Sequence, residues 1–250
     1  AAVVAAAAAA VGGVVPPAYL DGELMDEVVH LVEHPLPVLG SYEAAFLDLP
    51  ADILITVMRK HQRYFPVEDP ASPGKLLPAF VTVGNGNPDT FDAAAVREGN
   101  EAVLRARYAD AAFFYAKDTA EGVTLGSFVP SLAGLTFQEN AGSMLDKTKR
   151  VAALVPRLAA SLPVPLAAAD EADATAAAGL FKADLATALV VELTSLAGVM
   201  GRHYASLTGE VSEGAATAIY EAVLPRSAAD ALPATPAGVV LAVADRLDSL

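Results

Sequence analysis

The sequence predicts a predominantly helical protein, with an α+β part up to about residue 120 and an all-α part beyond it. Two short runs of β character, "RYFPV" and "LLPAFVTVGN", flank the turn formers "EDPASPGK" and predict a hairpin. Residues 88–118 then have the pattern of one long helix, and nearly every later segment has helical spacing between proline-marked breaks. We therefore expect two domains, residues 1–120 and residues 121–250.

Two further helices are predicted before the hairpin. Residues 21–34 carry apolar side chains on one helical face after a plausible cap at Asp21, and Pro35 and Pro37 should end this helix. The segment "LPADILITVMRKHQ", residues 49–62, predicts the second helix, with Pro50 near its first turn.

The long helix places two charged residues, Arg107 and Asp110, on the stripe that should face the core. This pattern favours a buried, hydrogen-bonded ion pair that fixes the packing register. The alternative is that Arg97, Arg105 or Arg107 meets phosphate at a domain junction, because the forked donors of arginine suit that contact.

Composition excludes several classes of protein. With 54% hydrophobic and 18% charged residues, the chain has enough apolar surface to offset the entropy cost of ordering. No strongly hydrophobic run reaches the roughly 20 residues needed to cross a bilayer. Cysteine is absent, which excludes disulfides, thiolate zinc sites and a cysteine nucleophile; it also fits a reducing compartment, so a cytoplasmic location is expected.

Charge is distributed unevenly around a formal net charge of -14. Residues 1–58 contain no Lys or Arg, residues 59–117 contain eight against seven acids, and residues 118–250 contain eight against fifteen. Any contact with a nucleic acid should therefore be local and confined to the middle of the chain.

Strong catalytic signatures are missing from the sequence. It has no glycine-rich nucleotide loop, no GxSxG elbow and no HExxH zinc motif. His30 and His34 have a spacing that a metal would accept, but two histidines at a helix end are more typical of a surface. We predict no catalytic residue and no metal site in this chain.

The segment "MRKHQRYFPVEDP", residues 58–70, combines basic and aromatic side chains. Its cations occupy the C-terminal end of a predicted helix, where they complement the helix dipole. The same side chains also suit the backbone of a nucleic acid. Both interpretations stay open on the residues alone.

Five segments together resemble the β subunit of the bacterial, two-subunit type of glycyl-tRNA synthetase. They are "HQRYFPV", "REGNEAVLRARYADAAFF", "LTFQENAGSMLDKTKRVAALV", "KADLATALVVELTSLAGVMGRHYA" with "GE" following, and "AIYEAVLPRSAADALPATPAGVVLAVADRLDSL". Ala141, where the family usually has a larger apolar residue, and the alanine-rich start depart from the pattern. The resemblance implies an interior fragment of that subunit.

The resemblance further implies a role in glycine-tRNA ligase, an aminoacyl-tRNA synthetase. In this family the separate α subunit activates glycine with ATP and Mg, while the β subunit binds and positions tRNA(Gly). The implied partners are the α subunit and tRNA(Gly), in an α2β2 heterotetramer away from membranes; this fragment alone should be inactive and bind no cofactor. The candidate tRNA contacts are Arg59, Lys60, Arg63, Arg97 and Arg105, with Tyr64 stacking on a base.

Residues 121–250 also look like a degenerate HD-type phosphohydrolase domain, truncated at its C-terminus. Such a domain holds divalent metals with histidines and carboxylates. The corresponding positions here are Asp146 or Lys147, Ala183, Asp184 and Asp245, with Lys182 beside them. Because every expected histidine is missing, we expect no hydrolase activity. An active metal-dependent phosphohydrolase and a helical interaction module without RNA contact remain the alternatives.

Overall fold

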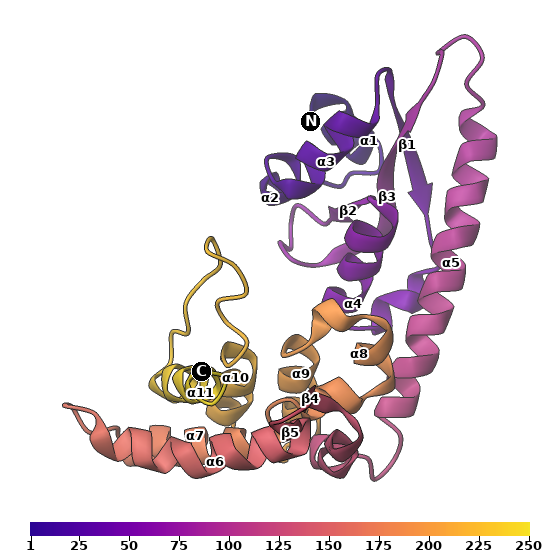
Figure 1. Ribbon diagram of the computed structural model, residues 1–250. Helices are drawn as coiled ribbons and strands as arrows, with labels where there is room; N and C mark the ends of the chain where they lie inside the picture. Colours follow the sequence, from indigo (N-terminus) through magenta and orange to yellow (C-terminus); the bar gives the residue numbers. More distant parts are fainter. The chain divides into compact units, whose positions relative to one another are not determined.

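A computed structural model describes all residues, 1–250 (Figure 1). The chain forms two compact units, Ala1–Phe114 and Tyr115–Leu250. It is 59% helical and contains a small antiparallel sheet, which confirms the prediction of a predominantly helical protein with an α+β part. None of its helices combines the length and the apolar character that a membrane span requires.

The first unit is built around a three-stranded antiparallel sheet. Its strands are β1 (Pro35–Ser41), β2 (Phe65–Glu68) and β3 (Leu76–Asn85), in the order β1-β3-β2. The predicted hairpin is therefore present as β2 and β3. Strand β1 was not predicted, because Pro35 and Pro37 indicated only the end of a helix.

The register explains why these prolines do not prevent a strand. The Tyr42 N–H donates to the Pro78 carbonyl at 3.1 Å, directly after the pairing of Ser41 with Ala79. Bonded and unbonded pairs alternate in an antiparallel ladder, so the odd-numbered residues of β1 turn their N–H groups to the free edge. Pro35 and Pro37 occupy odd positions, where a missing N–H costs no ladder hydrogen bond.

Three helices cover one face of this sheet: α1 (Ala2–Ala9), α2 (Pro17–Leu20) and α3 (Glu23–Leu31). Helix α3 begins after Gly22, so the predicted cap at Asp21 is wrong by one residue. Buried side chains from these helices and the sheet make one apolar core, which includes Val4, Leu24, Val28, Phe65, Val67 and Val81.

The predicted helix over residues 49–62 is present in two parts. The 3-10 helix η1 (Ala44–Asp48) comes first. Helix α4 (Ala51–Thr56) follows it and continues directly into a π-helical turn, η2 (Val57–His61). This arrangement places the basic residues of the segment at the end of the helical stretch, as predicted.

Helix α5 (Ala93–Asp118) begins later than predicted, because the Asp92 carboxylate accepts the N–H groups of Ala94 and Ala95 at 3.1 and 3.0 Å and caps it. Its buried residues include Leu104, Tyr108 and Ala111. Arg107 and Asp110 are exposed, so the predicted buried ion pair is wrong. Leu104 and Tyr108 have large apolar side chains and lie on a different face from Arg107 and Asp110. Burying them removes more apolar surface from water, so their face of the helix turns inward.

The second unit is helical apart from one short ribbon. Its longer helices are α6 (Met144–Ser161), α7 (Ala168–Leu180), α9 (Val199–Thr208), α10 (Glu213–Glu221) and α11 (Pro236–Leu247). Shorter elements are η3 (Leu125–Gly134), η4 (Ala183–Ala186), α8 (Ala188–Glu192) and η5 (Thr194–Leu196). The ribbon, β4 (Thr136–Gln138) and β5 (Gly142–Ser143), corrects the all-α prediction; Gly142 supplies the left-handed backbone with φ 83° that its turn requires.

Candidate functional site

Arg59 and Lys60 lie on the η2 turn of the first unit and differ in their surroundings. The Arg59 guanidinium stacks 4.6 Å from the centroid of the Tyr19 ring. Its Nε is buried without a hydrogen-bond partner. Burial raises the pKa of Tyr19, and the nearby Arg59 charge opposes that shift. Lys60 is exposed and forms no ion pair, so its ammonium group is free to meet an anion.

Arg63 closes this basic turn in an unusual backbone conformation. Its φ is 57°, in the left-handed region that residues other than glycine rarely adopt. Its Nε lies 2.5 Å from Oε1 of Glu27, and both side chains are almost half exposed. An ion pair in such exposure contributes little stability, so Arg63 can exchange Glu27 for another anion at small cost.

Tyr64 is buried rather than presented to solvent. Its ring stacks on Phe80 with centroids 4.6 Å apart and an interplanar angle of 16°. Its hydroxyl donates to Oδ1 of Asn100, and burial raises its pKa to about 12. The ring is therefore part of the core and has no free face for a nucleobase.

The other two candidate cations lie on α5. Arg105 places its Nε 2.5 Å from Oε1 of Glu43, and this hydrogen bond lowers the pKa of the Glu43 carboxyl. Arg97 is exposed and lines an apolar cavity beside β1. The six candidates thus do not form one cluster: three cations share the η2 turn and its exit, and the others have separate surroundings.

In the second unit, three of the positions that correspond to the metal site of an HD-type domain, Lys147, Lys182 and Asp245, form an ion cluster instead. Asp245 on α11 receives two ammonium groups, Lys182 Nζ at 2.9 Å from Oδ2 and Lys147 Nζ at 3.1 Å from Oδ1. The three donors of Lys147 are directed at the Asp245 carbonyl, Asp248 Oδ2 and Ser249 Oγ, at 3.0, 3.2 and 2.8 Å. Oδ1 of Asp245 therefore receives a charge contact without an aligned hydrogen bond.

Asp248 completes this cluster through Arg150 on α6. The guanidinium forks over the carboxylate, with Nε 2.6 Å from Oδ1 and Nη2 2.9 Å from Oδ2. We call these five residues the α6–α11 ion cluster: Lys147, Arg150, Lys182, Asp245 and Asp248. Sequence reasoning missed Arg150 and Asp248. Their signal was present, because two cations on α6 and two acids at the C-terminal end of α11 are each spaced three residues apart.

The other two carboxylates at these positions have structural partners elsewhere. Asp184 is buried, and its Oδ2 accepts the N–H groups of Gly198 and Gly201 at 2.5 and 3.2 Å. Burial raises the pKa of Asp184, while the two amide hydrogen bonds act in the opposite direction. Asp146 caps α6 by accepting the N–H and hydroxyl of Ser143, which lowers the pKa of Asp146.

These donors do not fit a divalent metal ion. Both oxygens of Asp245 face ammonium groups, which would repel a cation, and the bound oxygen of Asp184 is occupied by backbone amides. No group of three or more His, Asp or Glu side chains has an arrangement that could hold a metal. The spaced pair His30 and His34 therefore has no third ligand beside it. The site chemistry of an HD-type phosphohydrolase is not supplied by these residues.

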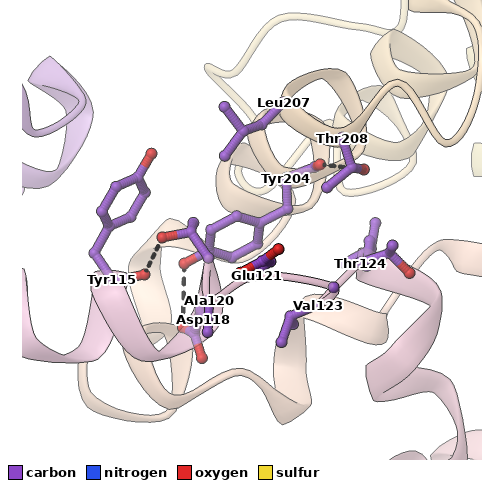
Figure 2. A pocket seen from close by; sticks show the side chains of 12 residues that line it. Tyr115, Asp118, Ala120, Glu121, Val123, Thr124, Tyr204, Leu207 and Thr208 are labelled. Carbon is purple, nitrogen blue, oxygen red and sulfur yellow. Dashed lines mark hydrogen bonds between the residues drawn. The ribbon is translucent and has the colours of Figure 1, made fainter.

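The second unit also contains a cavity of about 490 Å³ (Figure 2). In it the Tyr204 hydroxyl donates to Asp118 Oδ2 at 3.1 Å, and the same carboxylate accepts the N–H groups of Ala188 and Leu189. Burial, together with the Asp118 charge, raises the pKa of Tyr204. The lining includes Asp118 and Glu121 but no Lys or Arg, so this cavity does not suit a phosphate.

Comparison with known proteins gives the family of the chain. A family model described as "Glycyl-tRNA synthetase beta subunit" matches residues 2–250. The chain belongs to this family. The resemblance found in the five sequence segments is thereby confirmed, and the match extends through the alanine-rich start, which was expected to depart from the pattern.

Curated relatives agree with this family. The chain is 45% identical over 230 residues to the glycine–tRNA ligase, chloroplastic/mitochondrial 2, of Arabidopsis thaliana, covering 91% of this chain and 20% of that protein. It is 43% identical over 234 residues to the glycine–tRNA ligase beta subunit of Bacillus subtilis (strain 168), covering 92% and 33%. It is 45% identical over 233 residues to that of Picosynechococcus sp., covering 93% and 32%. The chain thus spans about a third or less of these relatives.

Proposed function

We propose that this chain is the part of a glycine-tRNA ligase β subunit that binds and positions tRNA(Gly) for the attachment of glycine. The observation that carries the proposal is the family match over residues 2–250, with relatives named as glycine–tRNA ligases. In the proposed complex, an α subunit carries the ATP- and Mg-dependent chemistry, and two α and two β subunits assemble in the cytoplasm.

The contacts of the acidic side chains in the second unit support a role in binding tRNA rather than in catalysis. Three carboxylates of the second unit are engaged: Asp245 and Asp248 pair with lysines and an arginine, and Asp184 accepts backbone amides. The residues that would supply hydrolysis are therefore engaged in packing helices together. A phosphohydrolase activity finds no support in this donor set.

The proposed RNA-contact set is Arg59, Lys60 and Arg63. These three cations lie within five residues at the end of α4 and its π turn. Lys60 has no ion pair, and Arg63 has only an exposed one. Contacts of this kind recognise the phosphate backbone by charge and position, not the base sequence. Tyr64 is outside the set because its ring is buried, and Arg97 and Arg105 are outside it because they lie on α5 and not on the η2 turn.

The test is the salt dependence of tRNA(Gly) binding by the full-length β subunit. The triple variant Arg59→Gln, Lys60→Gln and Arg63→Gln should weaken binding. It should also flatten the plot of log affinity against log salt by about one unit for each phosphate that no longer meets a cation. A matched variant removes three exposed cations elsewhere, Lys75→Gln, Lys149→Gln and Arg157→Gln, and should keep the original slope. Equal slopes in both variants would refute the contact set.

A further inference from the structure

A second cavity, of about 590 Å³, lies in the first unit beside strand β1. Apolar side chains of Val11, Leu39 and Leu77 contribute to its lining, together with Ser41 of β1 and Arg97 and Glu101 of α5. It therefore combines an apolar surface with a single cation.

The backbone of β1 turns one unused hydrogen-bonding pair toward this cavity. Odd-numbered residues of β1 direct their N–H groups to the free edge, as the pairing of Tyr42 with Pro78 shows. Pro35 and Pro37 have no N–H to offer, and the Ser41 N–H donates to Glu101 Oε1 at 2.8 Å. Leu39 is left as the residue of β1 whose outward N–H and carbonyl have no partner.

The two charged side chains of the lining differ in availability. Glu101 accepts both the N–H and the hydroxyl of Ser41, at 2.8 and 3.0 Å, so its carboxylate is already bound. Arg97 is exposed and has no ion pair. The available groups are therefore one N–H, one carbonyl and one guanidinium beside an apolar surface. This set accepts a carboxylate and an amide N–H, but it offers no free anion to a free ammonium group.

We propose that this cavity binds the C-terminal residue of a partner polypeptide with an aliphatic side chain. The terminal amide N–H donates to the Leu39 carbonyl, and one carboxylate oxygen accepts the Leu39 N–H. Arg97 receives the carboxylate charge, as forked guanidinium donors do. In an antiparallel pair, facing side chains lie on the same side, so the aliphatic group meets Leu39 and Leu77.

A chain end fits better than the other possible occupants. Two prolines on one side of Leu39 and the bound Ser41 on the other leave an edge one residue long, which is too short for an internal strand. A free amino acid would place its ammonium group where no unbound carboxylate receives it. An RNA strand would bring several phosphates to an apolar surface with one cation.

The experiment measures binding of a fluorescent N-acylated peptide, Gly-Ser-Gly-Leu with a free C-terminal carboxylate, to the full-length protein. The peptide should bind, and the same peptide with a C-terminal amide should bind at least tenfold more weakly. Arg97→Gln should weaken binding of the acid peptide at least tenfold, because glutamine cannot form a charge-assisted hydrogen bond with the carboxylate. The matched variant Arg107→Gln, at another exposed arginine of α5, should leave affinity unchanged.

Leu39→Pro tests the contribution of Leu39, because it removes both the outward N–H and the leucine side chain. It removes an outward N–H at a position equivalent to Pro35 and Pro37, so the sheet should persist while the peptide no longer binds. If this variant fails to fold, Arg97→Gln still decides the proposal. The proposal is overturned if the acid and amide peptides bind equally, if Arg97→Gln binds normally, if free leucine competes as well as the peptide, or if an RNA oligonucleotide displaces it through Arg97.

Discussion

Lys182 Nζ lies 2.9 Å from Oδ2 of Asp245 and joins the segment after α7 to helix α11. Lys182 reaches this position with a left-handed backbone, φ 73°, which costs on the order of 1 kcal/mol in a residue other than glycine. Its Nζ also lies 5.2 Å from the centroid of the Phe181 ring. The ammonium group of Lys182 therefore occupies the position beside the Asp245 carboxylate that would otherwise attract a free cation.

Replacing Asp245 should strongly destabilise the second unit. Asp245→Leu removes the one carboxylate partner of Lys182 and one of the two carboxylate partners of Lys147, and the Lys147 side chain is only 4% exposed. Removing one partner of a buried pair costs about 3–5 kcal/mol. The destabilisation should appear in urea unfolding monitored by circular dichroism.

An exposed pair provides the control for this measurement. Glu43→Leu removes the partner of Arg105, whose side chain is 55% exposed, and should cost less than about 1 kcal/mol. If Asp245→Leu were as mild as Glu43→Leu, the ion cluster would not hold α6 and α11 together.

Stability at low pH should depend on Asp248. The hydrogen bond from Arg150 keeps the pKa of this carboxyl below its ordinary value of 3.8, and Lys147 acts in the same direction. Its stabilising contribution is therefore present above that value and is lost as pH falls through the lower pKa of the folded state. The difference in unfolding free energy between the native protein and Asp248→Asn should shrink from pH 6 to pH 3.

The comparison with Asp248→Asn isolates this carboxyl from Asp184. Burial raises the pKa of Asp184, so its contribution has the opposite sign: it favours folding as pH falls. Asp184 is the same in both proteins and cancels in the difference. A difference that stays constant down to pH 3 would show that Arg150 does not hold the carboxylate.

Glycine at position 238 allows α10 and α11 to approach closely. A Cβ added there would lie 1.9 Å from Oε2 and 2.7 Å from Cβ of Glu221. Glu221 cannot move away easily, because it accepts the N–H groups of Ala234 and Thr235. Gly238→Ala should therefore destabilise the protein by about 1–3 kcal/mol in thermal or urea unfolding, despite the better helix propensity of alanine.

Gly179 offers the matched substitution in a helix without close neighbours. Nothing lies within 4 Å of a Cβ built there, so Gly179→Ala should stabilise α7 by about 0.5–1 kcal/mol. Opposite signs for the two substitutions separate packing from propensity. Stabilisation by both would mean that α10 and α11 are not in close contact at Gly238.

Local patterns in the sequence were sufficient for the elements that depend on neighbouring residues. The hairpin follows from turn formers between two β-type runs, and the helical second unit follows from apolar spacing. Strand β1 could not be predicted in this way. Whether Pro35 and Pro37 disrupt a strand depends on which residues face β3, and that register is set by residues far along the chain, as the pairing of Pro37 with Val83 illustrates.

The candidate site was predictable in residue type but not in environment. The cations of the η2 turn lie where the helix-end pattern placed them. Tyr64 lies in the core because Phe80 of β3 stacks on it, an arrangement that no local pattern reveals. The ion cluster likewise needs α6 and α11 to meet, and their matching charge spacing becomes meaningful only once the two helices are known to pack together.

The most direct test separates glycine activation from tRNA charging in the complex of α subunit and full-length β subunit. For Arg59→Gln, Lys60→Gln and Arg63→Gln combined, glycine-dependent pyrophosphate exchange should match the native rate, while the KM for tRNA(Gly) in charging should rise at least tenfold. This result would place the contribution of the chain in holding tRNA. An equal decrease in both reactions, or an unchanged KM for tRNA(Gly), would contradict it.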